Sequence, residues 1–61
     1  MSAYNLLLRL ITVKNKSKKN GHMTDDEYEN WKTNTLAKMD TFLICDRLTE
    51  EQYKELEGMF A

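Results

Sequence analysis

Apolar residues recur at helical spacing in three separate stretches of the chain. In the first stretch the apolar stripe stands at i, i+3, i+4 and i+7, formed by Tyr4, Leu7, Leu8 and Ile11. Further apolar residues widen this stripe: Leu6, Leu10 and Val13. A stripe this wide predicts a helix over residues 1–14 that is covered on more than one side.

The second and third stretches predict a long and a short helix. Residues 24–45 carry their large residues along one side, formed by Tyr28, Trp31, Thr35, Leu36, Met39, Phe42, Leu43 and Ile44. Residues 49–60 are shorter and present Tyr53, Leu56, Met59 and Phe60. We therefore expect an all-α, three-helix single domain with a long central helix and a helix-turn-helix-like C-terminal pair.

Eleven residues repeat almost in register along this pattern. Residues 22–32, HMTDDEYENWK, return 25 positions later as RLTEEQYKELE, residues 47–57. Each threonine is followed three residues later by Glu or Gln, the spacing of a capping box that ties the first turn of a helix. The predicted caps and their partners are Thr24, Glu27, Thr49 and Gln52. The acids of each copy fall in a first helical turn, where the helix dipole favours negative charge.

A basic, polar segment, residues 15–23, follows the first helix and predicts a surface loop. Residues 1–22 hold five basic residues and no acid, whereas residues 23–61 hold four basic residues and ten acids. Clustered lysines can bind a polyanion by displacing its counterions; the candidates are Lys14, Lys16, Lys18 and Lys19. A solvated loop is the competing interpretation, since no aromatic residue is interleaved for base stacking. Residues 21–23, Gly-His-Met, could alternatively be a cloning remnant.

The chemistry-bearing residues do not form a catalytic or metal-binding pattern. His22 and Cys45 are the only soft metal ligands and lie far apart in the sequence. Ser2 and Ser17 fall outside any nucleophile motif, and the chain has no glycine-rich phosphate loop. DNA reading by the third helix is disfavoured because residues 50–57 hold four acids and one lysine. We therefore expect a non-enzymatic protein without a metal or cofactor.

A chain of 61 residues buries only about 60% of its unfolded surface, so a partner is expected to add stability. Cys45 alone cannot form an intramolecular disulfide, which leaves self-association, as a dimer or larger, or docking on a larger protein. The candidate contact residues are Leu7, Leu8, Ile11, Trp31, Phe42 and Leu43. The longest apolar run is too short to span a membrane. A lone cysteine and no signal sequence predict a cytoplasmic protein.

The turn and helix residues of the second copy are Asp46, Leu48, Thr49, Glu51 and Tyr53, matched in the first copy by Gly21, Met23, Thr24 and Tyr28. Residues 36–60, which contain the second copy, resemble the short C-terminal bihelical (SHOCT-type) domain. In that domain a helix is followed by a Gly-x-Ile-Thr turn and an acidic, aromatic second helix. Asp46 stands where glycine is usual in that turn.

The same stretch is similar to very small helical proteins encoded by phages and prophages of Gram-positive bacteria. This resemblance implies a phage or prophage origin, a bacterial host cell, and a role in contacts with itself or with a phage or host protein. It implies no catalytic residues. The leading alternative is a nucleic-acid-associated or host-modulating accessory protein that uses the basic loop.

Overall fold

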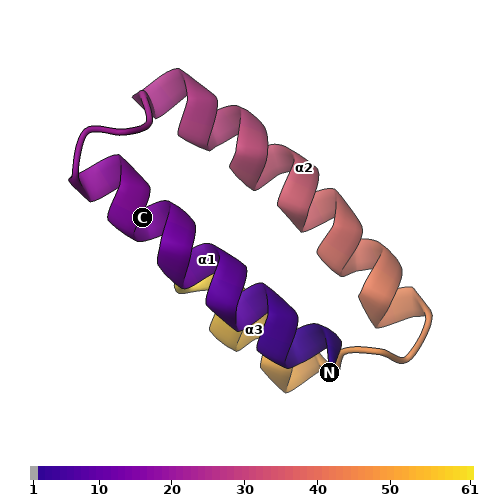
Figure 1. Ribbon diagram of the computed structural model, residues 1–61. Helices are drawn as coiled ribbons and strands as arrows, with labels where there is room; N and C mark the ends of the chain where they lie inside the picture. Colours follow the sequence, from indigo (N-terminus) through magenta and orange to yellow (C-terminus); the bar gives the residue numbers. More distant parts are fainter. Residues whose placement is uncertain (1) are drawn as a thin grey trace.

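Three helices joined by two short turns make up residues 2–61, the part of the chain that the computed structural model describes. They are α1 (Ala3–Lys19), α2 (Asp25–Ile44) and α3 (Glu50–Glu57). α2 runs antiparallel to α1. α3 lies behind α1 in this view and runs parallel to it (Figure 1). Each helix contacts the other two. The all-α, three-helix prediction is confirmed, and the described residues contain no strand.

The core lies where the three helices meet and draws on every element. Its buried members are Leu7, Ile11, Met39, Leu48 and Leu56. Half-buried side chains pack around them: Ala3, Tyr4, Leu8, Trp31, Leu36, Phe42, Tyr53, Met59 and Phe60. The molecule measures 35 × 18 × 18 Å. The long axis follows from α2, whose 20 residues rise about 30 Å at 1.5 Å each.

α1 is longer than the sequence pattern predicted. The helix continues through residues 15–19 and ends at Lys19, so the basic loop predicted for residues 15–23 is wrong over its first five positions. Lysine is a good helix former, and Lys16, Lys18 and Lys19 lie in the last turn, where the helix dipole favours positive charge. The actual turn covers residues 20–24.

The other boundaries are closer to expectation. The structure places α2 one residue inside each end of the predicted 24–45 range. α3 ends at Glu57, three residues earlier than the predicted end at residue 60. After Gly58 the chain leaves the helix, and Met59 and Phe60 turn back to pack against the core.

The two turns have the same backbone structure, offset by 25 positions. At the end of α1, His22 N–H donates to Ser17 O and Gly21 N–H to Lys18 O. At the end of α2, Arg47 N–H donates to Phe42 O and Asp46 N–H to Leu43 O. This pair of bonds is the Schellman motif, which requires a left-handed residue after the helix. Gly21 takes that role with φ 77°, and Asp46 takes it with φ 59°.

Both capping boxes are confirmed. Thr24 Oγ1 accepts from Glu27 N–H at 3.1 Å, and Glu27 Oε1 accepts from Thr24 N–H at 3.0 Å. Thr49 and Gln52 make the same two bonds at the same distances. The backbone bond from Thr24 lowers the pKa of Glu27 below its ordinary value, because the bond favours the ionised carboxylate.

Candidate interaction surfaces

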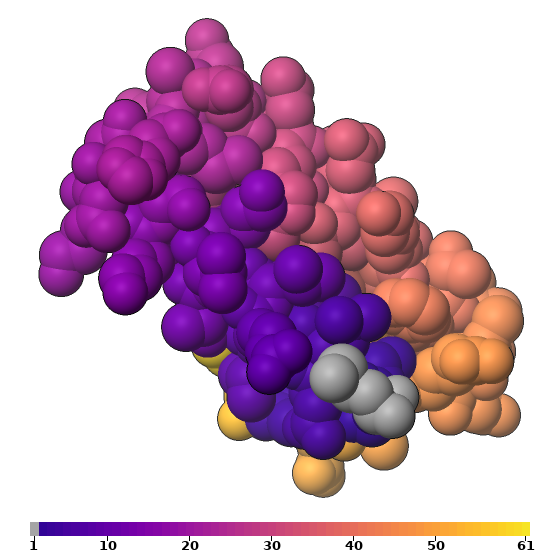
Figure 2. Space-filling view, viewed as in Figure 1, coloured from indigo at the N-terminus to yellow at the C-terminus, as the bar shows by residue number. Residues whose placement is uncertain are grey.

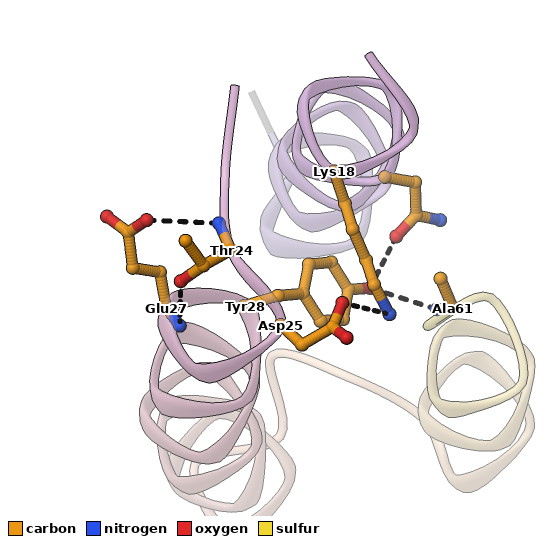
Figure 3. A network of polar contacts seen from close by, with 7 residues as sticks. Lys18, Thr24, Asp25, Glu27, Tyr28 and Ala61 are labelled. Carbon is orange, nitrogen blue, oxygen red and sulfur yellow. Dashed lines mark hydrogen bonds and ion pairs between the residues drawn. The ribbon is translucent and has the colours of Figure 1, made fainter. Parts of the chain in front are cut away.

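A buried tyrosine ties α1, α2 and the C-terminal segment together (Figure 3). The Tyr28 hydroxyl donates to Asn15 Oδ1 and accepts from Ala61 N–H at 2.9 Å. Asn15 Nδ2 in turn donates to Met59 O at 2.7 Å. The Lys18 ammonium lies 4.7 Å from the Tyr28 ring centroid, and the Trp31 ring lies 5.4 Å away. The Tyr28 hydroxyl and the Asn15 amide find their partners within the chain, so these bonds hold α1, α2 and the C-terminal segment in place.

The same bond occurs 25 positions later in a more exposed setting. The Tyr53 hydroxyl donates to Asp40 Oδ1 at 2.6 Å, again 13 residues back along the chain. This bond to a carboxylate raises the pKa of Tyr53 to about 12. A neutral amide accepts in the buried copy and a carboxylate in the exposed copy, which follows the high cost of burying a charge. A third tyrosine, Tyr4, donates to Glu55 Oε2 at 2.9 Å, which raises the pKa of Tyr4.

The four lysines expected to bind a polyanion do not form one patch. Lys14 and Lys18 are four residues apart on α1 and share one face of the helix, whereas Lys16 and Lys19 are three residues apart and share another face. Lys18 is engaged by its own chain, over the Tyr28 ring and 3.9 Å from Asp25 Oδ1. Lys14 is half-buried, and only Lys16 and Lys19 are exposed.

The six residues expected to contact a partner are largely enclosed by the chain itself. Leu7 and Ile11 are buried in the core. Trp31 packs between Tyr28 and Phe60, with ring centroids 5.4 and 5.6 Å apart. The remaining members are half-buried: Leu8, Phe42 and Leu43. Leu7 and Ile11 are therefore unavailable to a partner in the folded chain.

A different set of apolar residues is open to solvent. Leu6, Leu10 and Val13 expose 41%, 39% and 52% of their surfaces. They stand at i, i+4 and i+7 and so follow one another along α1, one side of which neither α2 nor α3 covers in Figure 2. In the sequence these three residues widen the first apolar stripe, which predicted that α1 is covered on more than one side. In the structure neither α2 nor α3 buries them. The other exposed large apolar residue of the described chain, Ile44, is the last residue of α2.

Exposed basic residues adjoin this stripe. Arg9 lies three residues after Leu6 and four before Val13, and Lys16 lies three after Val13. Lys19 continues the basic row one turn further. We refer to Leu6, Arg9, Leu10, Val13 and Lys16 together as the α1 outer surface. α1 contains no acidic residue, so this surface is apolar and positively charged.

Other kinds of site are not apparent in residues 2–61. No three His, Cys, Asp or Glu side chains converge as metal ligands. None of the described helices is long and apolar enough to cross a membrane. Comparison of the chain with protein-family models, with curated proteins and with solved structures finds no match.

Proposed function

We propose that this is a non-enzymatic protein that acts through protein–protein contact, with the α1 outer surface as its contact face. The observation that carries the proposal is the row formed by Leu6, Leu10 and Val13. It is the one place in residues 2–61 where large apolar side chains are exposed next to one another. Covering such a row removes apolar surface from water, which is favourable by roughly 25 cal/mol per Å².

The size of the molecule is compatible with a contact made by one helix. A standard interface covers about 800 Å² on each partner, which is a little under a fifth of the 4465 Å² accessible surface. α1 spans 17 residues, or about 26 Å. Its outer surface together with its flanks can therefore supply most of such an interface.

We place this role in a phage or prophage setting, inside the bacterial host cell. The support is the resemblance of residues 36–60 to the very small helical phage and prophage proteins described above. The left-handed backbone at Asp46 fits the bihelical resemblance of the same residues, because the usual glycine of that turn would adopt the same conformation. The free, exposed thiol of Cys45 suits a reducing compartment.

Nucleic-acid association is a second candidate, supported by the exposed row of Arg9, Lys16 and Lys19. Arg9 and Lys16 lie two turns apart along α1 and Lys19 about one turn further, so the three residues could contact separate phosphates. The helix-turn-helix arrangement of α2 and α3 does not add to this candidate. α3 exposes four acids and one lysine, which would repel a phosphate backbone.

Affinity capture from host and phage lysates tests the proposal. Leu10→Glu places a charge in the middle of the apolar row, and Ile44→Glu makes the same change at an exposed aliphatic residue outside the α1 outer surface. We expect proteins captured by the wild type to be retained by Ile44→Glu and lost by Leu10→Glu, with both variants giving wild-type circular dichroism. Identical capture by all three proteins would exclude the α1 outer surface as the contact face.

A further inference from the structure

The charges around the exposed apolar row restrict what can cover it. Arg9 and Lys16 flank the row on its solvent side, and Lys14 lies one position beyond Val13. All ten acids of the chain lie outside α1, in α2, α3 and the second turn. A complementary partner must therefore present apolar residues at helical spacing and negative charge beside them.

We infer that the α1 outer surface binds an acidic amphipathic helix of another protein, an inference that rests on the proposed function. Such a helix would carry apolar residues at i, i+4 and i+7 to meet Leu6, Leu10 and Val13. Glu or Asp residues along its edge would meet Arg9 and Lys16. This is the helix-against-apolar-surface mode of recognition, with charge selecting the partner and its orientation.

A second copy of this chain is a poor occupant. Pairing α1 with α1 of another copy, parallel or antiparallel, sets basic residues against basic residues, because α1 has no acid to offer. Pairing α1 with α3 of another copy would bring opposite charges together, but α3 has no exposed apolar residue to pack against Leu6, Leu10 and Val13. α3 exposes only charged residues: Glu50, Glu51, Lys54, Glu55 and Glu57.

A lipid surface fits less well than a protein helix. Helices that lie in a membrane interface insert aromatic or large aliphatic residues below their basic residues. Here the aromatic residues are turned inward, with none among the exposed large apolar side chains. Three partly exposed aliphatic residues give such a helix little to insert.

Titration of the isotope-labelled protein, followed by NMR, tests the inference with two synthetic helices of about 18 residues, matched to the length of α1. Both probes carry leucines at i, i+4 and i+7; one has glutamates beside the leucines and the other has lysines. We expect saturable shifts from the glutamate probe, concentrated at Leu6, Arg9, Leu10 and Val13. The lysine probe should bind at least roughly tenfold more weakly, because like charges would be brought together.

Variants assign this effect to the surface. Arg9→Glu should weaken the glutamate probe and strengthen the lysine probe, a charge-swap rescue that misfolding cannot produce. Lys54→Glu makes the same charge change on α3 and should leave both affinities unaltered. Equal affinity for the two probes, no saturable binding of the glutamate probe, or shifts centred on α3 would overturn the inference.

Three further results would also overturn the inference. One is a wild-type dimer in analytical ultracentrifugation that Leu10→Glu disrupts, which would assign the surface to a second copy. Another is co-sedimentation with phosphatidylcholine–phosphatidylglycerol vesicles that Leu10→Glu abolishes. The third is a captured protein that docks on α1 without an acidic helix; this leaves the proposed function intact. Capture unaffected by Leu10→Glu would instead defeat the proposed function.

Discussion

At the scale of single residues, two tyrosines 25 positions apart make the same hydrogen bond in different surroundings. Tyr28 is fully buried and its hydroxyl holds both Asn15 and Ala61. Tyr53 is half-buried and its hydroxyl holds Asp40 near solvent. Tyr28→Phe should lower the free energy of unfolding by about 1–3 kcal/mol, because it leaves buried groups without a partner. Tyr53→Phe should cost clearly less, since water can replace its hydroxyl.

Urea unfolding of the two single variants measures this difference. Phe differs from Tyr only by the hydroxyl, so ring packing is preserved in both variants and each serves as the control for the other. Equal losses of stability would show that burial of Tyr28 does not decide the strength of its network.

The raised pKa of Tyr53 predicts a loss of stability in alkaline solution. The folded value of about 12 lies above the ordinary value of 10.0, because the protonated hydroxyl donates to Asp40. The folded state therefore favours the protonated form. Its contribution is complete below about pH 10 and is lost as the pH rises towards 12. Thermal unfolding between pH 9 and 12, compared with Tyr53→Phe, should show a smaller loss in the variant.

A spectroscopic control isolates the cause. Asp40→Asn keeps an acceptor but removes its charge, so absorbance titration should show the pKa of Tyr53 moving down towards 10.0. An unchanged titration would mean that the Asp40 carboxylate does not set this pKa. Tyr4, whose pKa is raised by Glu55, should titrate as before in this variant.

The bond between Tyr28 and Asn15 could have been inferred from the repeat. Asn15 and Asp40 occupy matching positions 25 residues apart, as do Tyr28 and Tyr53. The polar composition around Asn15 predicts a loop there, so the sequence pattern limits the repeat to residues 22–32 and 47–57. Once residues 15–19 are helical, Asn15 lies on the inner side of α1, where its amide can reach both Tyr28 and Met59.

At the scale of the helices, the starts of α2 and α3 were predictable and the end of α1 was not. A capping box is a local pattern, so Thr24 and Thr49 identify their helix starts without knowledge of the fold. The end of a helix depends on which residue takes the left-handed turn. Gly21 marks that turn, yet the polar lysines before it are more typical of a loop than of a helix end. At Asp46 a non-glycine residue takes the same conformation, which composition alone does not reveal.

The two turns give a matched pair of predictions. Asp46→Gly should stabilise the protein by up to about 1 kcal/mol, because glycine adopts the left-handed conformation without steric cost. Gly21→Ala should destabilise it by about 1–2 kcal/mol. An added Cβ at Gly21 meets no atom within 4 Å, so that cost comes from the backbone conformation alone.

Differential scanning calorimetry would resolve both changes, since about 1 kcal/mol shifts the melting temperature by roughly 4–8 °C in a domain of this size. Gly58→Ala is the control, because Gly58 has a right-handed helical backbone and needs no glycine. A Gly21→Ala variant no less stable than Gly58→Ala would contradict the role of the left-handed turn.

At the scale of the whole molecule, the sequence predicted the apolar stripes of the helices but not which members of a stripe the fold leaves exposed. The wide first stripe predicts that both Leu7 and Leu10 are covered, yet Leu7 is buried and Leu10 is 39% exposed. The direction of α3 decides this, because it packs behind α1 and leaves the opposite side open (Figure 1). Packing directions of helices depend on tertiary contacts that periodicity does not encode.

The same arrangement governs how the protein should behave towards nucleic acid. In a flexible loop the four lysines could have gathered on one phosphate backbone. On the helical end of α1 they are divided between two faces, and Lys18 is held over Tyr28. The acids exposed on α3 add repulsion at the scale of the whole molecule. We therefore expect weak binding of generic DNA and RNA at about 50 mM salt that disappears by about 200 mM.

Gel shift at the two salt concentrations, with two double variants, decides between this expectation and the nucleic-acid candidate. Lys16→Ser with Lys19→Ser removes the exposed lysines and should alter stability by less than about 0.5 kcal/mol, as for most surface changes. Lys14→Ser with Lys18→Ser is the matched control. It also removes two charges, but it should lower stability because Lys18 covers the Tyr28 ring. Tight binding that survives the higher salt and vanishes only in the first double variant would favour nucleic-acid association over protein contact.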